Sequence, residues 1–448
     1  MRAKNENERI ACRYMLWLFV LLLASAAASA NDRPLSITGA TMGTTYSVKI
    51  GTASPGLDPL SGVVTENGRS SIDVLHELID ERLAEIDQRM STYKVDSEVT
   101  IFNSSKSEDW FPVSAETATV VNRALEISAQ TNGAFDITVG PLVRLWNFGA
   151  GSKANPTVPT GTEIERTQSQ TGYSNLDVRL EPPALRKRIP TLEIDLSGIG
   201  KGYAVDQIAS LLETHRISDY LVEIGGEIRV SGQPAHRSGQ ANWSLGIEAP
   251  RSDTRSVSQV LALTNQAMAS SGDYRNFFEV DGVRYSHTID PRTGRPVQHQ
   301  FAASTILASD CATADALATA ILVMGPNAME FCNSNGVPAL LFERTADLRS
   351  ISFNSHTSDV FPVDQLRSLS ESTAPDFAHI LAASIIVIGI AIVGMGIGVI
   401  FRNRCIKGSC GGMEGLTDEH GRPLCEGCSN PSPECTNDPT LQQQQPAN

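Results

Sequence analysis

The chain has 448 residues, which is long enough for two domains with appended segments and for a large buried core. Its 36 Lys and Arg residues against 50 Asp and Glu residues give a formal net charge of −14, and an acidic chain without a basic block is excluded as a nucleic-acid binder. Hydrophobic residues make up an ordinary 41% of the chain, but they concentrate in two runs that a soluble enzyme would not carry. Those two runs decide the predicted topology.

The N-terminal segment has the pattern of a secretory signal. Four basic residues precede an apolar run over residues 16–30, which closes in the small residues Ala28-Ser29-Ala30. This pattern predicts a signal peptide over residues 1–30, cleaved before Asn31. An uncleaved membrane anchor is the alternative interpretation.

The second apolar run predicts a transmembrane helix. Residues 380–401 contain no charge, and 22 residues at about 1.5 Å each cross a hydrocarbon core of about 30 Å. Arg402, Arg404 and Lys407 follow directly, so the positive-inside rule places the C-terminus in the cytosol. The predicted organisation is therefore an extracytoplasmic domain over 31–368, a linker over 369–379, the membrane helix and a cytosolic tail over 402–448.

The extracytoplasmic domain shows an α+β pattern with largely antiparallel strands. Apolar residues recur at helical spacing or turn signals frame a helix in four segments, namely 72–90, 115–130, 201–214 and 313–324. Strands are predicted over 192–196, 220–224, 228–230, 277–280, 283–288 and 303–308. Asp281-Gly282 is the strongest hairpin signal among them. The polar, Pro-containing stretch 150–190 is interpreted as a connecting region or insertion.

Cysteines divide between the two predicted compartments. Cys311 and Cys332 lie in the exported part, where a disulfide and two buried thiols are both compatible with the sequence. Five more crowd the short tail, and their soft thiolates predict an iron or zinc site there. These five are Cys405, Cys410, Cys425, Cys428 and Cys435.

Three features of the exported domain suggest chemistry. The glycine-rich turn 195–203 leads from a predicted strand into a helix with Lys201 at its positive end, a place for a pyrophosphate or a metal ion. Asp315 and Thr319 lie one turn apart on one helix face and offer hard oxygen ligands for Mg²⁺. His287 lies in a turn-rich segment as a candidate general base. Taken alone, each feature is by default a structural one, namely a structural turn, an ion-free pair of side chains and a structural histidine.

Taken together, ordered motifs over roughly residues 36–365 resemble those of the FAD:protein FMN transferases, the ApbE family. The motifs are Met42-Gly43-Thr44, Met90-Ser91-Thr92-Tyr93, residues 133–141, residues 195–206, Gly225-Gly226, Ser271-Gly272, residues 287–294 and residues 314–319.

The resemblance implies a reaction and a set of site residues. Members of that family transfer FMN from FAD to a Ser or Thr hydroxyl of a target protein, release AMP and require Mg²⁺. By resemblance, His287 is the catalytic histidine, and Gly198, Asp315 and Thr319 hold the metal ion. The implied FAD contacts are Met42, Tyr93, Ala134, Phe135, Asp136, Asp195, Lys201 and Ile289.

The C-terminal segment carries a second resemblance. Residues 380–436, with the stretch KGSCGG, look like NqrM, a maturation factor of the Na⁺-translocating NADH:quinone reductase. The cysteines that match are Cys410, Cys425, Cys428 and Cys435, whereas Cys405 is extra. This resemblance implies iron delivery to the reductase in the cytosol and flavin attachment to its subunits in the periplasm, from a chain anchored in the bacterial inner membrane.

Two other functions are compatible with the same residues. A Mg²⁺-dependent FAD pyrophosphatase would use the same site with water as acceptor and release free FMN and AMP. A non-catalytic flavin-binding protein would leave FAD intact.

Overall fold

The computed structural model describes residues 34–51, 60–61, 63, 69–149, 156–234, 242–251, 256–345 and 352–368. The predicted signal peptide, juxtamembrane linker, membrane helix and cysteine-rich tail lie outside these residues and stay predictions. Within the described ranges no helix is both long and apolar enough to cross a membrane.

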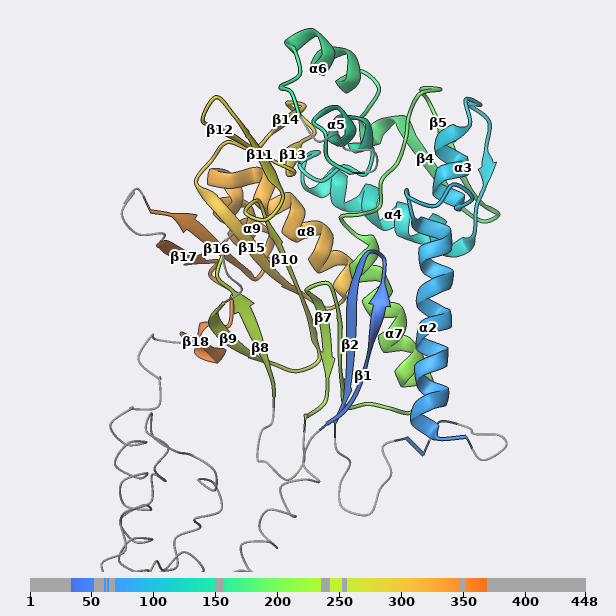
Figure 1. The fold of residues 1–448 in the computed structure, drawn as a ribbon, viewed down its shortest axis with the longest axis vertical. Helices are drawn as coiled ribbons and strands as arrows, with labels where there is room; N and C mark the ends of the chain where they lie inside the picture. Colours follow the sequence, from blue (N-terminus) through green and yellow to red (C-terminus); the bar gives the residue numbers. More distant parts are fainter. Residues whose placement is uncertain are drawn as a thin grey trace, which may run out of the picture. The chain divides into compact units, whose positions relative to one another are not determined.

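A large antiparallel sheet organises the described part of the chain (Figure 1). Its eight strands there lie in the order β1, β2, β6, β7, β10, β15, β16, β17, and every neighbouring pair is antiparallel. Their bounds are β1 Leu35–Thr41, β2 Thr44–Ile50, β6 Tyr220–Ile224, β7 Glu227–Ser231, β10 Gln266–Gly272, β15 Phe301–Ala308, β16 Ala339–Arg344 and β17 Phe353–Thr357.

Each face of this sheet buries its own core, because side chains alternate between the two faces along a strand. In β6, Val222 and Ile224 pack in the core beneath the helices, whereas Leu221 packs in the opposite core. Helices α2 (Ser71–Met90), α7 (Gly200–Thr214) and α8 (Cys311–Met324) pack on the first face. A three-stranded sheet, ordered β18, β9, β8, packs on the second face through Trp243 and Leu261. The large sheet is therefore covered on both faces, by the helices on one and by the three-stranded sheet on the other.

Smaller elements complete the described part. The second-face sheet consists of β8 Trp243–Glu248, β9 Val257–Leu263 and β18 Leu366–Ser368. A further sheet consists of β3 Phe111–Pro112, β4 Leu176–Leu180 and β5 Pro183–Lys187, and two hairpins of β11 Phe277–Val280 with β12 Val283–Ser286 and of β13 Ile289–Asp290 with β14 Arg295–Pro296. The other helices are α3 Glu98–Ser104, α4 Ala115–Gln130, α5 Gly140–Leu145, α6 Gly161–Gln168 and α9 Ala328–Asn335, with 3₁₀ turns at Tyr173–Asn175, Gly325–Asn327 and Val363–Gln365.

The α+β class and the predicted helices are confirmed, but the interpretation of 150–190 as a connecting region is wrong. Helix α6 and the hairpin β4–β5 lie within it. The helix begins with a capping box, in which the Thr160 hydroxyl accepts from the Glu163 backbone N–H and the Glu163 carboxylate accepts from the Thr160 N–H. Such a cap starts a helix even where apolar residues are sparse.

The predicted strand 192–196 is also wrong. Its backbone finds a side chain instead of a neighbouring strand: the Asn103 amide donates to the Ile194 carbonyl oxygen and accepts from the Ile194 N–H, both at 2.8 Å. A side-chain amide presents an NH₂ donor and a carbonyl acceptor side by side, so it can pair with the N–H and the C=O of a single residue, as a neighbouring strand would. The segment therefore enters the glycine-rich turn as an extended loop.

Helices α7 and α8 approach each other closely at Gly202, and this contact gives a first prediction. A Cβ on Gly202 would lie 2.3 Å from the Cys311 carbonyl oxygen, which is backbone. Gly202→Ala should therefore destabilise the fold by about 1–3 kcal/mol, as overpacked cores do. Chemical denaturation would measure this. Gly161→Ala is the matched control, because nothing lies within 4 Å of that added Cβ; equal stability of the two variants would contradict the close approach.

Candidate functional site

The site lies where the N-terminal ends of α7 and α8 meet. The Lys201 ammonium lies 2.5 Å from Glu227 Oε1 and 3.9 Å from Asp315 Oδ1. The Gly202 backbone N–H donates to Asp315 Oδ2 at 3.0 Å. Asp315 and Glu227 are almost fully buried. One cation therefore holds two buried carboxylates from two elements, α8 and β7.

Two effects dominate the electrostatics of this cluster: burial, and the attraction between one ammonium and two carboxylates. Burial lowers the pKa of Lys201, but the carboxylates of Asp315 and Glu227 outweigh it and raise that pKa above its ordinary value. Burial raises the pKa of Asp315, against the attraction of Lys201. Burial also raises the pKa of Glu227, whose Oε2 has no hydrogen-bond partner. The cluster contains two carboxylates but only one ammonium, so it suits the binding of a further cation.

The predicted metal ligands come together here. Thr319 follows Asp315 by one turn of α8, and its hydroxyl lies 3.3 Å from that of Ser271 on β10. A Cβ on Gly198 would lie 3.5 Å from Thr319 Oγ1. A carboxylate, a hydroxyl and a loop carbonyl are hard oxygen donors that leave positions open, so these residues fit Mg²⁺. In the described ranges no three His, Cys, Asp or Glu side chains gather as a metal cluster.

Two glycine turns bring other predicted residues to this cluster. A Cβ on Gly225, where φ is +63°, would lie 3.4 Å from Lys201 Cδ and 3.0 Å from the Thr44 side chain. The neighbouring turn, Met42-Gly43, joins β1 to β2 with positive φ at both residues. Such backbone suits glycine and is rare for methionine. Met42 therefore lies at the tip of a tight hairpin, and Thr44 of the same hairpin borders the glycine turn that Lys201 contacts.

The turn after α4 contributes Ala134, Phe135 and Asp136. The Phe135 ring lies 3.1 Å from the position of a Cβ on Gly198, so it packs against the predicted metal loop. The Asp136 carboxylate accepts from the Thr138 N–H and hydroxyl at 2.7 Å each, and from the Tyr173 N–H at 2.8 Å. Burial raises the pKa of Asp136, against these hydrogen bonds. Its carboxylate fixes the turn, and its predicted contact with FAD stays a prediction.

The other predicted FAD contacts are spread around these elements. The Asp195 N–H donates to the Ile137 carbonyl oxygen at 2.6 Å, and its carboxylate accepts from the Ser197 N–H, which shapes the glycine-rich turn. Tyr93 is 68% exposed, so its ring is open to a ligand. Ile289 is buried in an apolar cluster with Trp146 and Phe148.

His287 is held in one orientation beside that apolar cluster. Its backbone N–H donates to the Asn276 carbonyl oxygen at 3.0 Å, and Nδ1 lies 3.1 Å from the same oxygen. A carbonyl only accepts, so Nδ1 carries the proton and Nε2 is the free base. The Phe148 ring meets the imidazole edge-on, with centroids 6.3 Å apart. Burial lowers the pKa of His287, against the Asn276 carbonyl and the Asp273 carboxylate.

Sequence reasoning missed Glu227 and left Ser271 without a role. The available signals were their positions directly after Gly225-Gly226 and directly before Gly272. Cys311 and Cys332 are both buried free thiols, which settles the alternatives for that pair. The four tail cysteines predicted to bind metal lie outside the described residues.

Comparison with known proteins agrees with this geometry. The sequence pattern of the ApbE family matches residues 42–341. A Vibrio cholerae protein named FAD:protein FMN transferase is 41% identical over 334 residues, covering 74% of this chain and 94% of that protein. An Escherichia coli K12 protein of the same name is 37% identical, covering 69% and 84%. The structure of the Vibrio cholerae flavin transferase ApbE superposes with a TM-score of 0.62 at 40% identity, covering 73% of this chain and 97% of that chain. This chain belongs to the ApbE family.

Proposed function

We propose that the chain transfers FMN from FAD to a Ser or Thr hydroxyl of a target protein and releases AMP. The observation that carries this proposal is the convergence of Lys201, Asp315 and Thr319 at the facing ends of α7 and α8. Phosphoryl transfer depends on positioning and charge neutralisation more than on covalent help from the protein. The side chains of this cluster can supply both positioning and charge neutralisation.

Each residue of the cluster has a defined task. Lys201, at the N-terminal end of α7, adds positive potential where the pyrophosphate of FAD would lie. Asp315, Thr319 and the Gly198 carbonyl would hold Mg²⁺, which when bound neutralises phosphate charge. Glu227 holds the Lys201 ammonium at 2.5 Å, which fixes its direction.

His287 is the general base for the acceptor hydroxyl. Its Nε2 accepts the proton of the acceptor hydroxyl as that oxygen forms a bond to the phosphorus of the FMN half. The bond from that phosphorus to the bridging oxygen breaks, and AMP leaves with the electron pair. The Asn276 carbonyl keeps Nδ1 protonated, so Nε2 stays the acceptor.

The pKa of His287 predicts how the rate depends on pH. Because burial lowers this pKa below its ordinary value of 6.5, the imidazole is neutral near pH 7 and serves as a base. We expect kcat/KM to rise with pH through an apparent pKa below 6.5 and then to stay level up to about pH 8. A pH profile of wild type and of His287→Asn measures this. A step that persists in the variant would assign the ionisation to another group.

AMP release tests the proposed reaction against its two alternatives. Chain, FAD and Mg²⁺ are incubated with and without a flavin-acceptor subunit of Na⁺-translocating NADH:quinone reductase. A transferase releases AMP only when the acceptor is present. A pyrophosphatase releases equal AMP and soluble FMN without it, and a non-catalytic flavin-binding protein releases neither.

We further propose that the exported domain is periplasmic and that the tail supplies iron to the same reductase in the cytosol. Support comes from the charge pattern around residues 380–401 and from the tail cysteines. In the full chain, Cys410→Ala should keep FMN transfer but fail to support reductase assembly. Modification of Cys425 or Cys428 by a membrane-impermeant thiol reagent on intact cells would reverse the proposed topology.

A further inference from the structure

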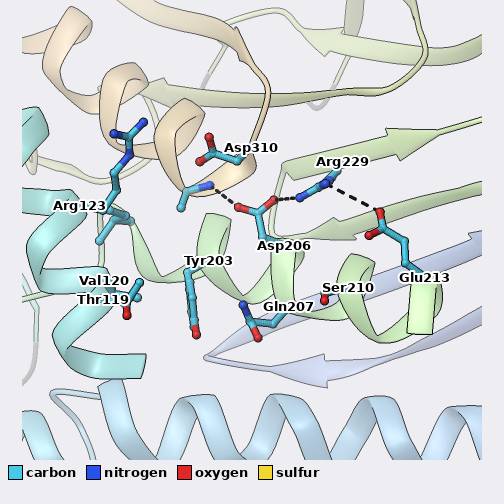
Figure 2. Close-up of a pocket in the computed structure, with 12 residues that line it drawn as sticks. Thr119, Val120, Arg123, Tyr203, Asp206, Gln207, Ser210, Glu213, Arg229 and Asp310 are labelled. Atoms are coloured by element: carbon cyan, nitrogen blue, oxygen red, sulfur yellow. Dashed lines mark hydrogen bonds and ion pairs between the residues drawn. The ribbon is translucent and has the colours of Figure 1, made fainter. Parts of the chain in front are cut away.

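Asp206 of α7 lies directly against the N-terminal end of α8 (Figure 2). Its Oδ1 accepts from the Cys311 N–H and its Oδ2 from the Ala312 N–H, both at 2.9 Å. Five residues along a helix turn the face by roughly 140°, so Asp206 projects from a different face of α7 than Lys201. It therefore contacts α8 from outside the phosphate and metal cluster.

A second carboxylate, that of Asp310, caps α8 but does not connect it to α7. Asp310 accepts from the Thr313 N–H at 2.8 Å and directly precedes α8 in the chain. Its cap is local, because donor and acceptor move together with the helix end. Asp206 comes from another helix, 105 residues earlier, so its two bonds fix where α8 stands relative to α7.

Asp206 is itself held from the sheet. Arg229 Nη1 donates to Asp206 Oδ1 at 2.8 Å, and Arg229 lies on β7 two residues after Glu227, which holds Lys201. Strand β7 thus holds α7 at two points through ion pairs. The Asp206 side chain is 13% exposed, so its pair with Arg229 is partly shielded from solvent.

Packing alone does not hold Asp206 in place. Beside it is a cavity of about 370 Å³, which Tyr203, Gln207 and Glu213 also line (Figure 2). Three hydrogen bonds hold the carboxylate on the wall of this cavity.

We propose that Asp206 is a positioning residue for the divalent-cation site, an inference that rests on the proposed function. Helix α7 holds α8 at two points one turn apart, through the Gly202 N–H on Asp315 and through Asp206 on the first two N–H groups of α8. Asp315 and Thr319 belong to α8, whereas Gly198 belongs to the loop before α7. Loss of the Asp206 contact lets one set of ligands shift relative to the other.

Asp206→Asn is the informative substitution because all three partners of the carboxylate are donors. An amide offers one oxygen, and its NH₂ group must face the N–H of α8 or the Arg229 guanidinium. The shape is kept, while either the contact with Ala312 or the two contacts with Cys311 and Arg229 become donor against donor. Asp310→Ala is the matched control, since it removes a cap of the same helix while the contacts of Asp206 with α8 stay in place.

The test measures binding of Mn²⁺, a hard cation that takes the same oxygen ligands as Mg²⁺, by the EPR signal of free Mn²⁺ in the presence of FAD and without acceptor. We expect Asp206→Asn to raise the Mn²⁺ dissociation constant on the order of tenfold, as loss of outer supports of a metal site does. Asp310→Ala should leave it unchanged at a similar loss of thermal stability.

Two outcomes would overturn the inference: wild-type Mn²⁺ affinity in Asp206→Asn, or equal weakening in both variants, which would mean simple loss of helix stability. Asp315→Ala separates this from the proposed function, because unchanged Mn²⁺ binding in that variant would refute the metal site itself. If Asp206→Asn does not fold, Arg229→Gln replaces it. That variant removes the bond from Arg229 but keeps both backbone N–H bonds of Asp206. It should also raise the Mn²⁺ dissociation constant. Wild-type affinity in Arg229→Gln would overturn the inference as well.

Discussion

Replacing Asp315 with Ala should abolish FMN transfer with little change in the fold. The substitution removes the one charged metal ligand predicted on α8. It takes no apolar volume from the core, and Lys201 keeps Glu227 as its partner at 2.5 Å. The fold loses the 3.9 Å ion pair with Lys201 and the hydrogen bond from the Gly202 N–H, whose unsatisfied buried donor costs about 1–3 kcal/mol. Transfer rates across a Mg²⁺ series, with thermal unfolding alongside, measure both effects.

Thr319→Val tests the same metal site with a smaller expected effect. It keeps the shape of the side chain and removes only a neutral oxygen donor, so the loss of activity should be smaller and partly overcome by more Mg²⁺. If the Asp315→Ala protein transferred FMN at the wild-type rate in limiting Mg²⁺, α8 would not be the metal-binding helix.

Replacing His287 with Asn should lower turnover by roughly 10²- to 10⁴-fold while FAD binding is retained, the usual range for losing a general base. Asn fills a similar volume and can still donate to the Asn276 carbonyl, but it has no nitrogen that accepts a proton. Single-turnover kinetics separate the chemical step from binding.

His356→Asn is the matched control for that variant. His356 lies on β17, paired with Glu343 at 2.8 Å, so its loss should leave transfer unchanged. If His287→Asn instead loses FAD affinity at an unchanged turnover rate, His287 is a binding residue and another group takes the proton.

What the sequence predicted well is what short-range geometry determines. Asp315 and Thr319 share a face because they are one turn apart on the helix predicted over 313–324. Asp281-Gly282 fixes the hairpin β11–β12, whose register pairs Phe277 with Ser286 and so brings Asn276 to His287. The backbone contact between Asn276 and His287 follows from this register, whereas the orientation of the imidazole was not predicted.

What the sequence could not predict depends on partners far along the chain. Residues 192–196 alternate like a strand, yet the partner of Ile194 is a side chain 91 residues away. Glu227 shows no charge pattern with Lys201, because only the packing of β7 against α7 brings them together. Asp206 reads as an ordinary helical residue, and only the crossing of α7 with α8 gives it two backbone N–H groups to accept from.

The most direct test of the proposed transfer is intact-mass and peptide mass spectrometry of the acceptor subunit after incubation with the chain, FAD and Mg²⁺. We expect FMN joined through a phosphoester to one Ser or Thr, none on an acceptor with Ala at that position, and none when the chain carries Asp315→Ala. An unmodified acceptor beside free FMN and AMP would contradict the account, since the same cluster would then pass the phosphoryl group to water.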